Sequence, residues 1–183
     1  MSNVIIATPV YREAAPEMLE CRRRVMNTRR SPNGGDVTVY RMADISRARN
    51  ALINMAFSQE SVTHVYFWDA DIITPHTGGD VGNLIDMMLE HDLPFVAGDC
   101  GTIDSRGRVG GASMLIRRDV FDALSTPDLQ YTPGYYAVFM PMIDDGEYLS
   151  EDYAFCQRWF NVGGHIHVDP EIVLEHLDQS PAI

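Results

Sequence analysis

The sequence predicts a three-layer α/β/α fold with a mostly parallel central sheet. Short apolar stretches that are typical of buried strands alternate along the chain with longer stretches whose apolar residues recur at helical spacing. No linker, repeat or low-complexity segment divides the 183 residues, a length that suits one domain. We therefore expect residues 1–183 to form a single domain.

The first half of the chain is expected to supply three strands and two helices. The strands lie at residues 3–8, 37–40 and 64–68, and the helices at 14–28 and 45–58. A turn is expected at 31–35, which reads Ser-Pro-Asn-Gly-Gly. The second helix carries its apolar residues on one face, and Asp44 or Ser46 can cap its first turn.

The second half continues this alternation around one irregular stretch. Helices are expected at 80–91, 118–124 and 150–162, and strands at 93–97, 112–116, 165–168 and 172–174. Ser150 would cap the last helix, and Gly163 and Gly164 would end it. Residues 125–149 hold three prolines and several tyrosines, which predicts irregular structure. The residues after His176 are expected to form a loose tail.

The charge balance excludes some kinds of chemistry. The chain has 26 acidic residues against 14 basic ones, a net charge of −12, and every basic residue is an arginine. Without lysine, a P-loop lysine and a Schiff base are both excluded. The missing lysine fits either GC-rich coding or a high-salt or viral source. An acidic chain repels nucleic acid on average, so contact with it would need a local basic patch.

Cysteine use and hydropathy favour a cytoplasmic protein. Cys21, Cys100 and Cys156 show no pairing pattern, which is typical of free thiols in a reducing compartment. No run of about 18 apolar residues is present, which argues against a transmembrane helix. The opening residues 4–7 are typical of a first strand rather than of a signal peptide. We expect a cytoplasmic location, in the host if the source is viral.

Two aspartates, Asp69 and Asp71, directly follow the expected strand at 64–68. The carboxyl edge of an open α/β sheet is where such folds bind ligands. Two carboxylates one residue apart can turn toward a hard divalent ion such as Mg²⁺ or Mn²⁺, which prefers oxygen ligands. The alternative is a solvated turn at the end of a strand.

The helix expected at 45–58 begins with two arginines, Arg47 and Arg49. Free backbone N–H groups and the positive end of the helix dipole favour an anion there, and the two guanidinium groups could reach a diphosphate. The alternative is that both arginines lie on the surface and pair with nearby acids.

Further acids and a histidine stand at the ends of other elements. Glu151 and Asp152 fall in the first turn of the last helix, where they could supply a general base or simply favour the helix dipole. His176 follows an apolar strand and could complete a metal site, or it could be an ordinary surface histidine.

Five segments, taken in order, read VIIATPVYRE, ISRARNALINMAF with THVYFWDADIITP, GGASMLIRRDVFDAL, LSEDYAFCQRW and VDPEIVLEH, and they span residues 4–176. Together they resemble the GT-A glycosyltransferases of the Asp-x-Asp, family-2-like type. The segment LSEDYAFCQRW resembles the Glu-Asp helix of inverting members, and both an inverting and a retaining mechanism stay open. The chain is short for this family, which leaves little room for a separate acceptor domain. The family usually has His-Gly near the end, whereas this chain has His176 followed by leucine.

The resemblance implies a donor site and a metal site. Asp71 would bind the metal directly, Asp69 would hold the ribose or a metal-bound water, and His176 would be the third contact, with His165 or His167 as replacements. The nucleoside would be lined by Thr8, Pro9 and Tyr11. The diphosphate would be faced by Arg47 and Asn50, with Arg49 as a possible replacement. The backbone could approach the sugar at Gly110 and Gly111. Asp152, with Glu151, would be the catalytic base or would orient the acceptor.

The implied activity is transfer of a sugar from a nucleotide-sugar, UDP-sugar being the first choice, to an acceptor hydroxyl with Mn²⁺ or Mg²⁺. The acceptor could be a saccharide or DNA that carries a hydroxymethylated base, which the arginines at 22–30 could contact. A second subunit of the same chain could complete the acceptor site. Aromatic residues in 125–149 suit sugar rings or nucleobases. The alternatives are a sugar nucleotidyltransferase and a non-catalytic nucleotide- or sugar-binding subunit.

Overall fold

The structure is a computed structural model that describes residues 2–11, 13–28, 35–40, 42, 44–74 and 84–177. At 24–28, 36 and 40 it describes the backbone alone. Within these residues, no helix has both the length and the hydrophobicity that a membrane span requires.

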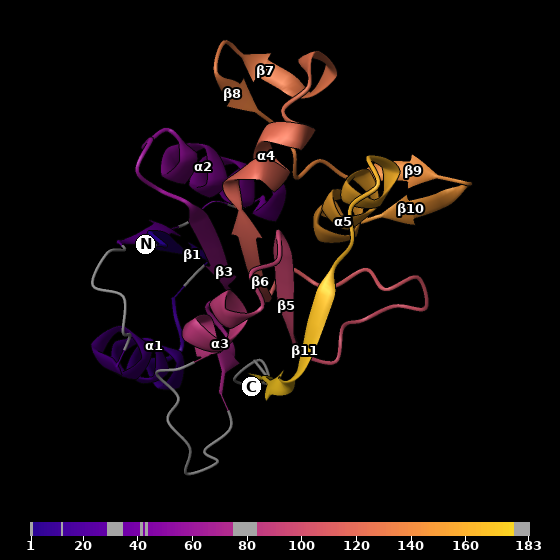
Figure 1. Ribbon diagram of the computed structural model, residues 1–183. Coiled ribbons are helices and arrows are strands. Elements are labelled where there is room, and N and C mark those ends of the chain that lie inside the picture. The colour runs from indigo at the N-terminus through magenta and orange to yellow at the C-terminus, as the bar shows by residue number, and fades with distance from the viewer. Residues whose placement is uncertain are drawn as a thin grey trace, which may run out of the picture.

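A six-stranded mixed sheet forms the centre of the molecule (Figure 1). Its strands are β1 (Val4–Val10), β2 (Asp36–Tyr40), β3 (His64–Trp68), β5 (Phe95–Asp99), β6 (Ser113–Arg117) and β11 (His167–Val173), in the order β11-β5-β6-β3-β1-β2. Only β6 runs antiparallel to its neighbours in this sheet, and the pairs β1–β2, β1–β3 and β5–β11 are parallel. The mostly parallel sheet of the predicted fold class is confirmed.

Helices cover both faces of this sheet. Helices α1 (Pro16–Thr28) and α3 (Leu84–Glu90) pack on the face that carries Val4, Ile6 and Trp68. Helices α2 (Ile45–Phe57), α4 (Arg118–Leu124) and α5 (Glu151–Asn161) pack on the face that carries Ile5 and Phe67. Because side chains alternate along a strand, β1 and β3 can supply apolar residues to both layers, which explains their continuous apolar sequences.

Several predicted elements are confirmed, two of them to the residue. The strand 64–68 and the helix 118–124 have their predicted bounds. The helix predicted at 80–91 is present at Leu84–Glu90, and its predicted first turn lies outside the described residues, as do most of the turn at 31–35 and the tail after 177. The two strands predicted at 165–168 and 172–174 are one strand, β11, whose pairing with β5 shifts between Asp169 and Val173.

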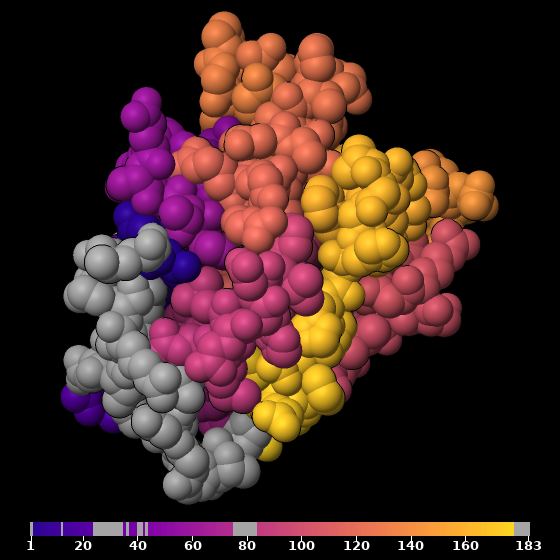
Figure 2. Space-filling view, viewed as in Figure 1, coloured from indigo at the N-terminus to yellow at the C-terminus, as the bar shows by residue number. Residues whose placement is uncertain are grey.

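The prediction of irregular structure at 125–149 is wrong. This stretch contains a 3₁₀ turn (Pro127–Leu129) and two hairpins, β7 (Gln130–Thr132) with β8 (Tyr135–Tyr136) and β9 (Met142–Asp144) with β10 (Glu147–Leu149). The second hairpin turns through Asp145 and Gly146, whose φ values of 50° and 80° fit the two-residue hairpin turn that Asp-Gly favours. Both hairpins project from the body of the molecule (Figures 1 and 2).

A further pair of short strands lies just beyond the main sheet. Strand β4 (Ile72–Ile73) pairs antiparallel with β12 (Glu175–His176), so the last described residues return to the segment that follows β3. In addition, the amide of Leu177 donates to the carbonyl of Asp71 at 2.7 Å. The segment that follows β3 and the last described residues of the chain therefore meet at the carboxyl edge of the sheet.

Candidate active site

The carboxyl ends of the parallel strands and the start of β6 share one edge of the sheet. Asp69 follows the last residue of β3, Trp68, which pairs with Ser113 at the start of the antiparallel strand β6. The amide of Asp69 donates to the carbonyl of Ala112 at 3.3 Å. The antiparallel direction of β6 therefore brings Gly110 and Gly111 beside the Asp69 backbone.

Arg49 on α2 is the centre of the polar contacts at this edge. Its side chain is 3% exposed, and its guanidinium donates to Asp69 Oδ2 at 2.9 Å, to Glu151 Oε1 at 3.2 Å and to the carbonyl of Gly111 at 2.8 Å. Burial lowers the pKa of Arg49, but the carboxylates of Asp69 and Glu151 more than offset this and raise its pKa above the ordinary value. The site thus contains a buried, charged arginine between two acids.

Both predicted glycines are packed against other side chains of the site. A Cβ built on Gly111 would lie 2.2 Å from Arg49 Cζ, and one on Gly110 would lie 2.5 Å from Thr102 Oγ1. The amide of Gly110 donates to that same threonine hydroxyl at 3.1 Å. The absence of a side chain at Gly111 is therefore what admits the arginine.

Two neighbouring acids begin α5 in different surroundings. Asp152 is partly exposed, and its carboxylate accepts from the amides of Gly111 at 3.0 Å and Tyr153 at 2.8 Å, and from the Ser150 hydroxyl. Glu151 is buried and bound to Arg49. Burial, followed by the charge of Asp152, raises the pKa of Glu151, and Arg49 opposes this shift. The predicted side-chain cap by Ser150 is wrong, because its hydroxyl is bonded to Asp152 and caps no amide.

The predicted metal ligands lie at this edge without forming a complete site. Asp69 Oδ1 is buried and has no hydrogen-bond partner among the described residues. Because buried polar atoms normally have a partner, this oxygen is a candidate to bind a cation or to accept a hydrogen bond from a ligand. Asp71 follows within the same turn and is partly exposed. Within residues 2–177, as far as the structure describes them, no three His, Cys, Asp or Glu side chains are grouped closely enough to hold an ion. The two aspartates fit a hard divalent cation that takes its remaining ligands from elsewhere.

The histidines divide between the two edges of the sheet. His176 pairs with Ile72, next to Asp71 in sequence, but its side chain is exposed. His167 pairs with Val96 near the start of β5, and His165 precedes it, so both lie at the opposite edge. His165 and His167 as replacements for His176 in the metal site are therefore wrong.

The predicted nucleoside residues follow β1 to the same edge. Thr8 is fully buried, and its Oγ1 has no hydrogen-bond partner among the described residues. Its neighbour in β2 is Thr38, whose hydroxyl accepts from both terminal nitrogens of Arg22 at 3.1 Å. Pro9 is buried, and Tyr11 is 62% exposed just beyond the strand. An unsatisfied hydroxyl and an exposed ring at this edge are compatible with a nucleoside contact.

The first turn of α2 differs from its predicted role. Asp44 caps the helix by accepting from the amides of Ser46 and Arg47, so these amides are not free for an anion as expected. The Arg47 side chain is 81% exposed, with its Nε 3.7 Å from Asp44. The Asn50 side chain bonds both the amide and the carbonyl of Phe139, at 2.8 and 3.0 Å. Asn50 thus holds the segment after β8, and Arg47 alone of the three predicted diphosphate residues reaches solvent.

Two arginines of the predicted basic cluster are engaged within the protein. Arg22 is 7% exposed and bonded to Thr38, and Arg23 pairs with Glu20 at 2.7 Å. The side chains of Arg24, Arg29 and Arg30 lie outside the described part of the chain.

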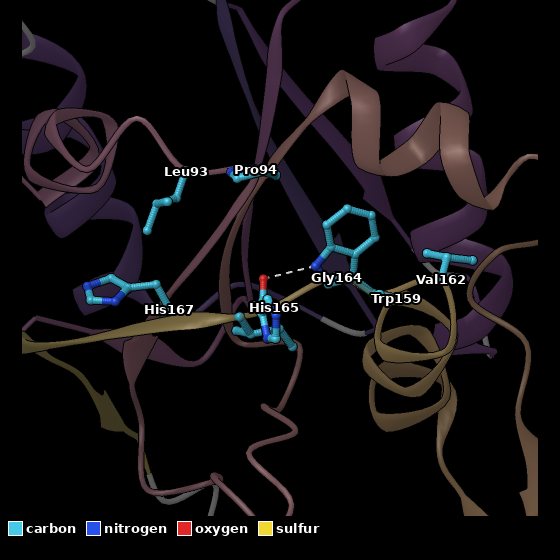
Figure 3. Close-up of a pocket in the computed structure, with 9 residues that line it drawn as sticks. Leu93, Pro94, Trp159, Val162, Gly164, His165 and His167 are labelled. Carbon is cyan, nitrogen blue, oxygen red and sulfur yellow. Dashed lines mark hydrogen bonds between the residues drawn. The ribbon is translucent and has the colours of Figure 1, made fainter.

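A cavity of about 450 Å³ lies away from this site, at the opposite edge of the sheet (Figure 3). Its walls come from Leu93 and Pro94 before β5, from Trp159 near the end of α5, and from residues 162–167. The Trp159 indole donates to the carbonyl of His165 at 2.9 Å. Glu151 and Trp159 are on different turns of a helix that rises about 1.5 Å per residue, so this cavity is separate from the acids at the start of α5.

Sequence reasoning missed the central position of Arg49 and the contacts of Thr102. A usable signal was present for Arg49, which is three residues before Leu52 and four before Ile53 and therefore falls on the buried face of its helix. An arginine there has to be buried and paired. No comparable signal marks Thr102, because its role depends on the path of the segment between β5 and β6.

Comparison with solved structures identifies the fold. Protein A197 from STIV is similar with a TM-score of 0.60 and 11% identity, over 95% of this chain and 85% of that one. A glycosyltransferase involved in glycosylation of the major capsid of PBCV-1 gives 0.57 and 10%, over 98% and 96%. The catalytic domain of Drosophila beta1,4galactosyltransferase 7, in complex with xylobiose, gives 0.54 and 14%, over 91% and 64%. The chain therefore has the GT-A fold.

The same fold also occurs in a sugar nucleotidyltransferase. A putative glucose-1-phosphate thymidylyltransferase from Bacillus anthracis, in complex with a sucrose, has a TM-score of 0.52 and 12% identity, over 93% of this chain and 86% of that one. The sequence matches no family model and has no significant match among curated proteins. At these identities the comparisons establish the fold alone.

Proposed function

We propose that this protein is a metal-dependent glycosyltransferase that moves a sugar from a nucleoside diphosphate to an acceptor hydroxyl. The observation that carries the proposal is the buried oxygen of Asp69, which lacks a partner among the described residues on a GT-A fold. Asp71 lies two residues further along the chain, and Arg49 links Asp69 to Gly111, whose amide binds Asp152.

Each group has a role that follows from its surroundings. Asp69 and Asp71 would hold a Mn²⁺ or Mg²⁺ ion, which when bound offsets the charge that develops on the departing diphosphate. Arg47, exposed beside the start of α2, would attract the diphosphate. Asp152, which is partly exposed and fixed by the Gly111 amide, would take the proton of the acceptor hydroxyl at a carboxylate oxygen.

Thr8 and Tyr11 would contact the nucleoside part of the donor. The buried Thr8 hydroxyl lacks a partner among the described residues, and the Tyr11 ring is exposed at the end of β1. UDP is the first nucleotide to test. Gly110 and Gly111 would form the backbone wall next to the sugar, while Arg49 and Thr102 fill the space behind them.

We propose a saccharide rather than DNA as the acceptor. Arg22 is buried and bonded to Thr38, and the charge of the exposed Arg23 is partly offset by Glu20, which weakens the basic cluster that DNA would need. The galactosyltransferase neighbour was solved with xylobiose. Transfer to a saccharide should depend little on salt, whereas transfer to hydroxymethylated DNA should fall steeply as salt rises.

Nucleotide titration followed by thermal melting tests the proposal. We expect UDP, GDP or TDP to raise the melting temperature only when Mn²⁺ is present. A ligand at 100 times its dissociation constant adds about 2.7 kcal/mol of stability, a readily measured shift. Asp71→Ala should abolish the shift, and Asp122→Ala, which removes an exposed carboxylate from α4, should leave it intact. A wild-type protein that responds to none of the nucleotides under any metal would contradict the proposal.

The second candidate function is a sugar nucleotidyltransferase, which the thymidylyltransferase neighbour suggests. Such an enzyme would release pyrophosphate from a nucleoside triphosphate. The absence of lysine from the sequence removes the residue expected to neutralise that triphosphate, so we rank this function second.

A further inference from the structure

One buried guanidinium joins acids from opposite sides of the candidate site. Asp69 directly follows β3, and Glu151 begins α5. The proposed function assigns the donor to the Asp69 side and the acceptor to the start of α5. Their side chains are 19% and 11% exposed, and both bind Arg49, whose side chain is 3% exposed. These two ion pairs share a cation that is itself almost completely shielded from water, as do the pairs of Arg108 with Asp104 and Glu147.

Shielding makes the two ion pairs dependent on each other. Coulomb interactions are several times stronger in a poorly solvated site than in water, so a change of charge at one acid is felt at the other through the arginine. If Glu151 loses its charge, the attraction of Arg49 is directed to Asp69 alone. Asp69 is then more completely neutralised and attracts an additional cation less strongly.

The position of Arg49 is also fixed sterically. The guanidinium lies against the backbone of Gly111, where even a methyl group would come within 2.4 Å of three of its atoms. The carbonyl of Gly111 accepts one of its N–H groups at 2.8 Å, and the amide of Gly111 binds Asp152. The Arg49 guanidinium therefore cannot move toward one of the two acids without weakening its ion pair with the other.

We propose that Arg49 is a positioning residue that couples donor binding at Asp69 to the acid Glu151, without contacting the donor itself. The inference rests on the proposed function in assigning a donor to Asp69. Linkage makes the coupling reciprocal, so the charge of Glu151 changes donor affinity by the same factor by which the donor changes the energetics of Glu151.

The first experiment measures binding of UDP, GDP and TDP in Mn²⁺ to the wild type and to Glu151→Gln. Glutamine keeps the size of the side chain and removes its charge. We expect affinity for the nucleotide that binds to fall by about fivefold or more, the lower end of measured allosteric couplings. Glu147→Gln is the matched control, because Glu147 pairs with Arg108 and not with Arg49. Equal affinities in the wild type and Glu151→Gln would overturn the inference.

Replacing the arginine separates coupling from a merely structural role. Arg49→Lys keeps a positive charge but loses the planar fork that reaches two acids and a carbonyl. In the lysine background, Glu151→Gln should no longer change nucleotide affinity. Arg118→Lys provides a control for loss of a fork, since among the described residues Arg118 binds the carbonyls of Phe57, Gln59 and Val62 and no acid.

A second experiment needs no nucleotide and keeps the inference distinct from the proposed function. Urea midpoints are measured for Asp69→Asn, Glu151→Gln and the double variant. The double variant should lose more unfolding free energy than the sum of the losses in the two single variants, because it leaves the buried Arg49 cation without a carboxylate partner. Additive losses would overturn the coupling. If the wild type binds no nucleotide while the losses are non-additive, the proposed function fails, and with it the donor part of the inference, while the coupling between Asp69 and Glu151 through Arg49 stands.

Discussion

At the scale of single residues, the site is distinguished by polar groups that are buried and shared. Arg49 donates hydrogen bonds to three partners, and the side chain of Asn50, the next residue, forms hydrogen bonds with the amide and the carbonyl of Phe139. The sequence shows that these residues are polar and follow a helix start, but it does not show what lies opposite them. Their partners are 20 to 102 residues away along the chain, so only the completed fold reveals them.

Asn50 is expected to contribute to stability rather than to donor binding. Asn50→Ala leaves a backbone amide and a carbonyl of Phe139 without partners in a buried site, which should cost about 1–3 kcal/mol of unfolding free energy. Urea denaturation measures this loss. Asn161→Ala, on the exposed end of α5, is the control and should cost much less. Equal losses in the two variants would show that the Phe139 contacts contribute nothing.

His64 predicts a dependence of stability on pH. Burial, followed by the charge of Arg117, lowers the pKa of His64 from 6.5 to about 4. Between these values the unfolded chain binds the proton more tightly, so this contribution to stability is full above pH 6.5 and is lost as pH falls toward about 4. Replacing it by glutamine should make urea midpoints less dependent on pH over that interval. An unchanged slope in His64→Gln would exclude this histidine as its source.

At the scale of elements, the long apolar segments were predictable and the short hairpins were not. Strand β3 and helix α4 have their predicted bounds because periodicity and burial agree there. In residues 125–149, the prolines and tyrosines led to a prediction of irregular structure where the fold has two hairpins. The Asp145–Gly146 pair did carry a signal, because both residues favour the positive φ values that a two-residue hairpin turn needs.

The start of α2 predicts the effect of removing a helix cap. Asp44 accepts from the amides of Ser46 and Arg47, and Asp44→Ala should lower the unfolding free energy by about 0.5–2 kcal/mol. Asp44→Asn keeps a capping oxygen and should lose less. Chemical denaturation of both variants distinguishes the cap from the charge. A loss of equal size in both would assign the effect to the charge.

At the scale of the whole molecule, the sequence predicted the fold class but not the arrangement of strands around the site. The class followed from alternating elements, and the five family-like segments placed the acids in the right order along the chain. The approach of Gly111 to Asp69 depends on β6 running antiparallel between β3 and β5. No local pattern encodes that direction, because it results from competition among pairings over the whole sheet.

The acidic composition should make the protein more stable in moderate salt. A net charge of −12 implies self-repulsion in the compact state, which ions screen over a Debye length of about 10 Å at 0.1 M. We expect the melting temperature to rise as NaCl increases from about 0.01 M to about 0.1 M. A fall over that range would mean that ion pairs such as Arg108–Glu147 outweigh the repulsion.

The most direct test of the central claim is identification of the small product released from labelled nucleotide-sugars. The protein is incubated with UDP-, GDP- and TDP-sugars, Mn²⁺ and a panel of saccharides, and the products are separated by chromatography. The account predicts that one donor yields its nucleoside diphosphate together with a glycosylated acceptor, only with metal and not in Asp71→Ala. Turnover of nucleoside triphosphate and sugar phosphate to pyrophosphate, with no nucleoside diphosphate from any donor, would contradict it.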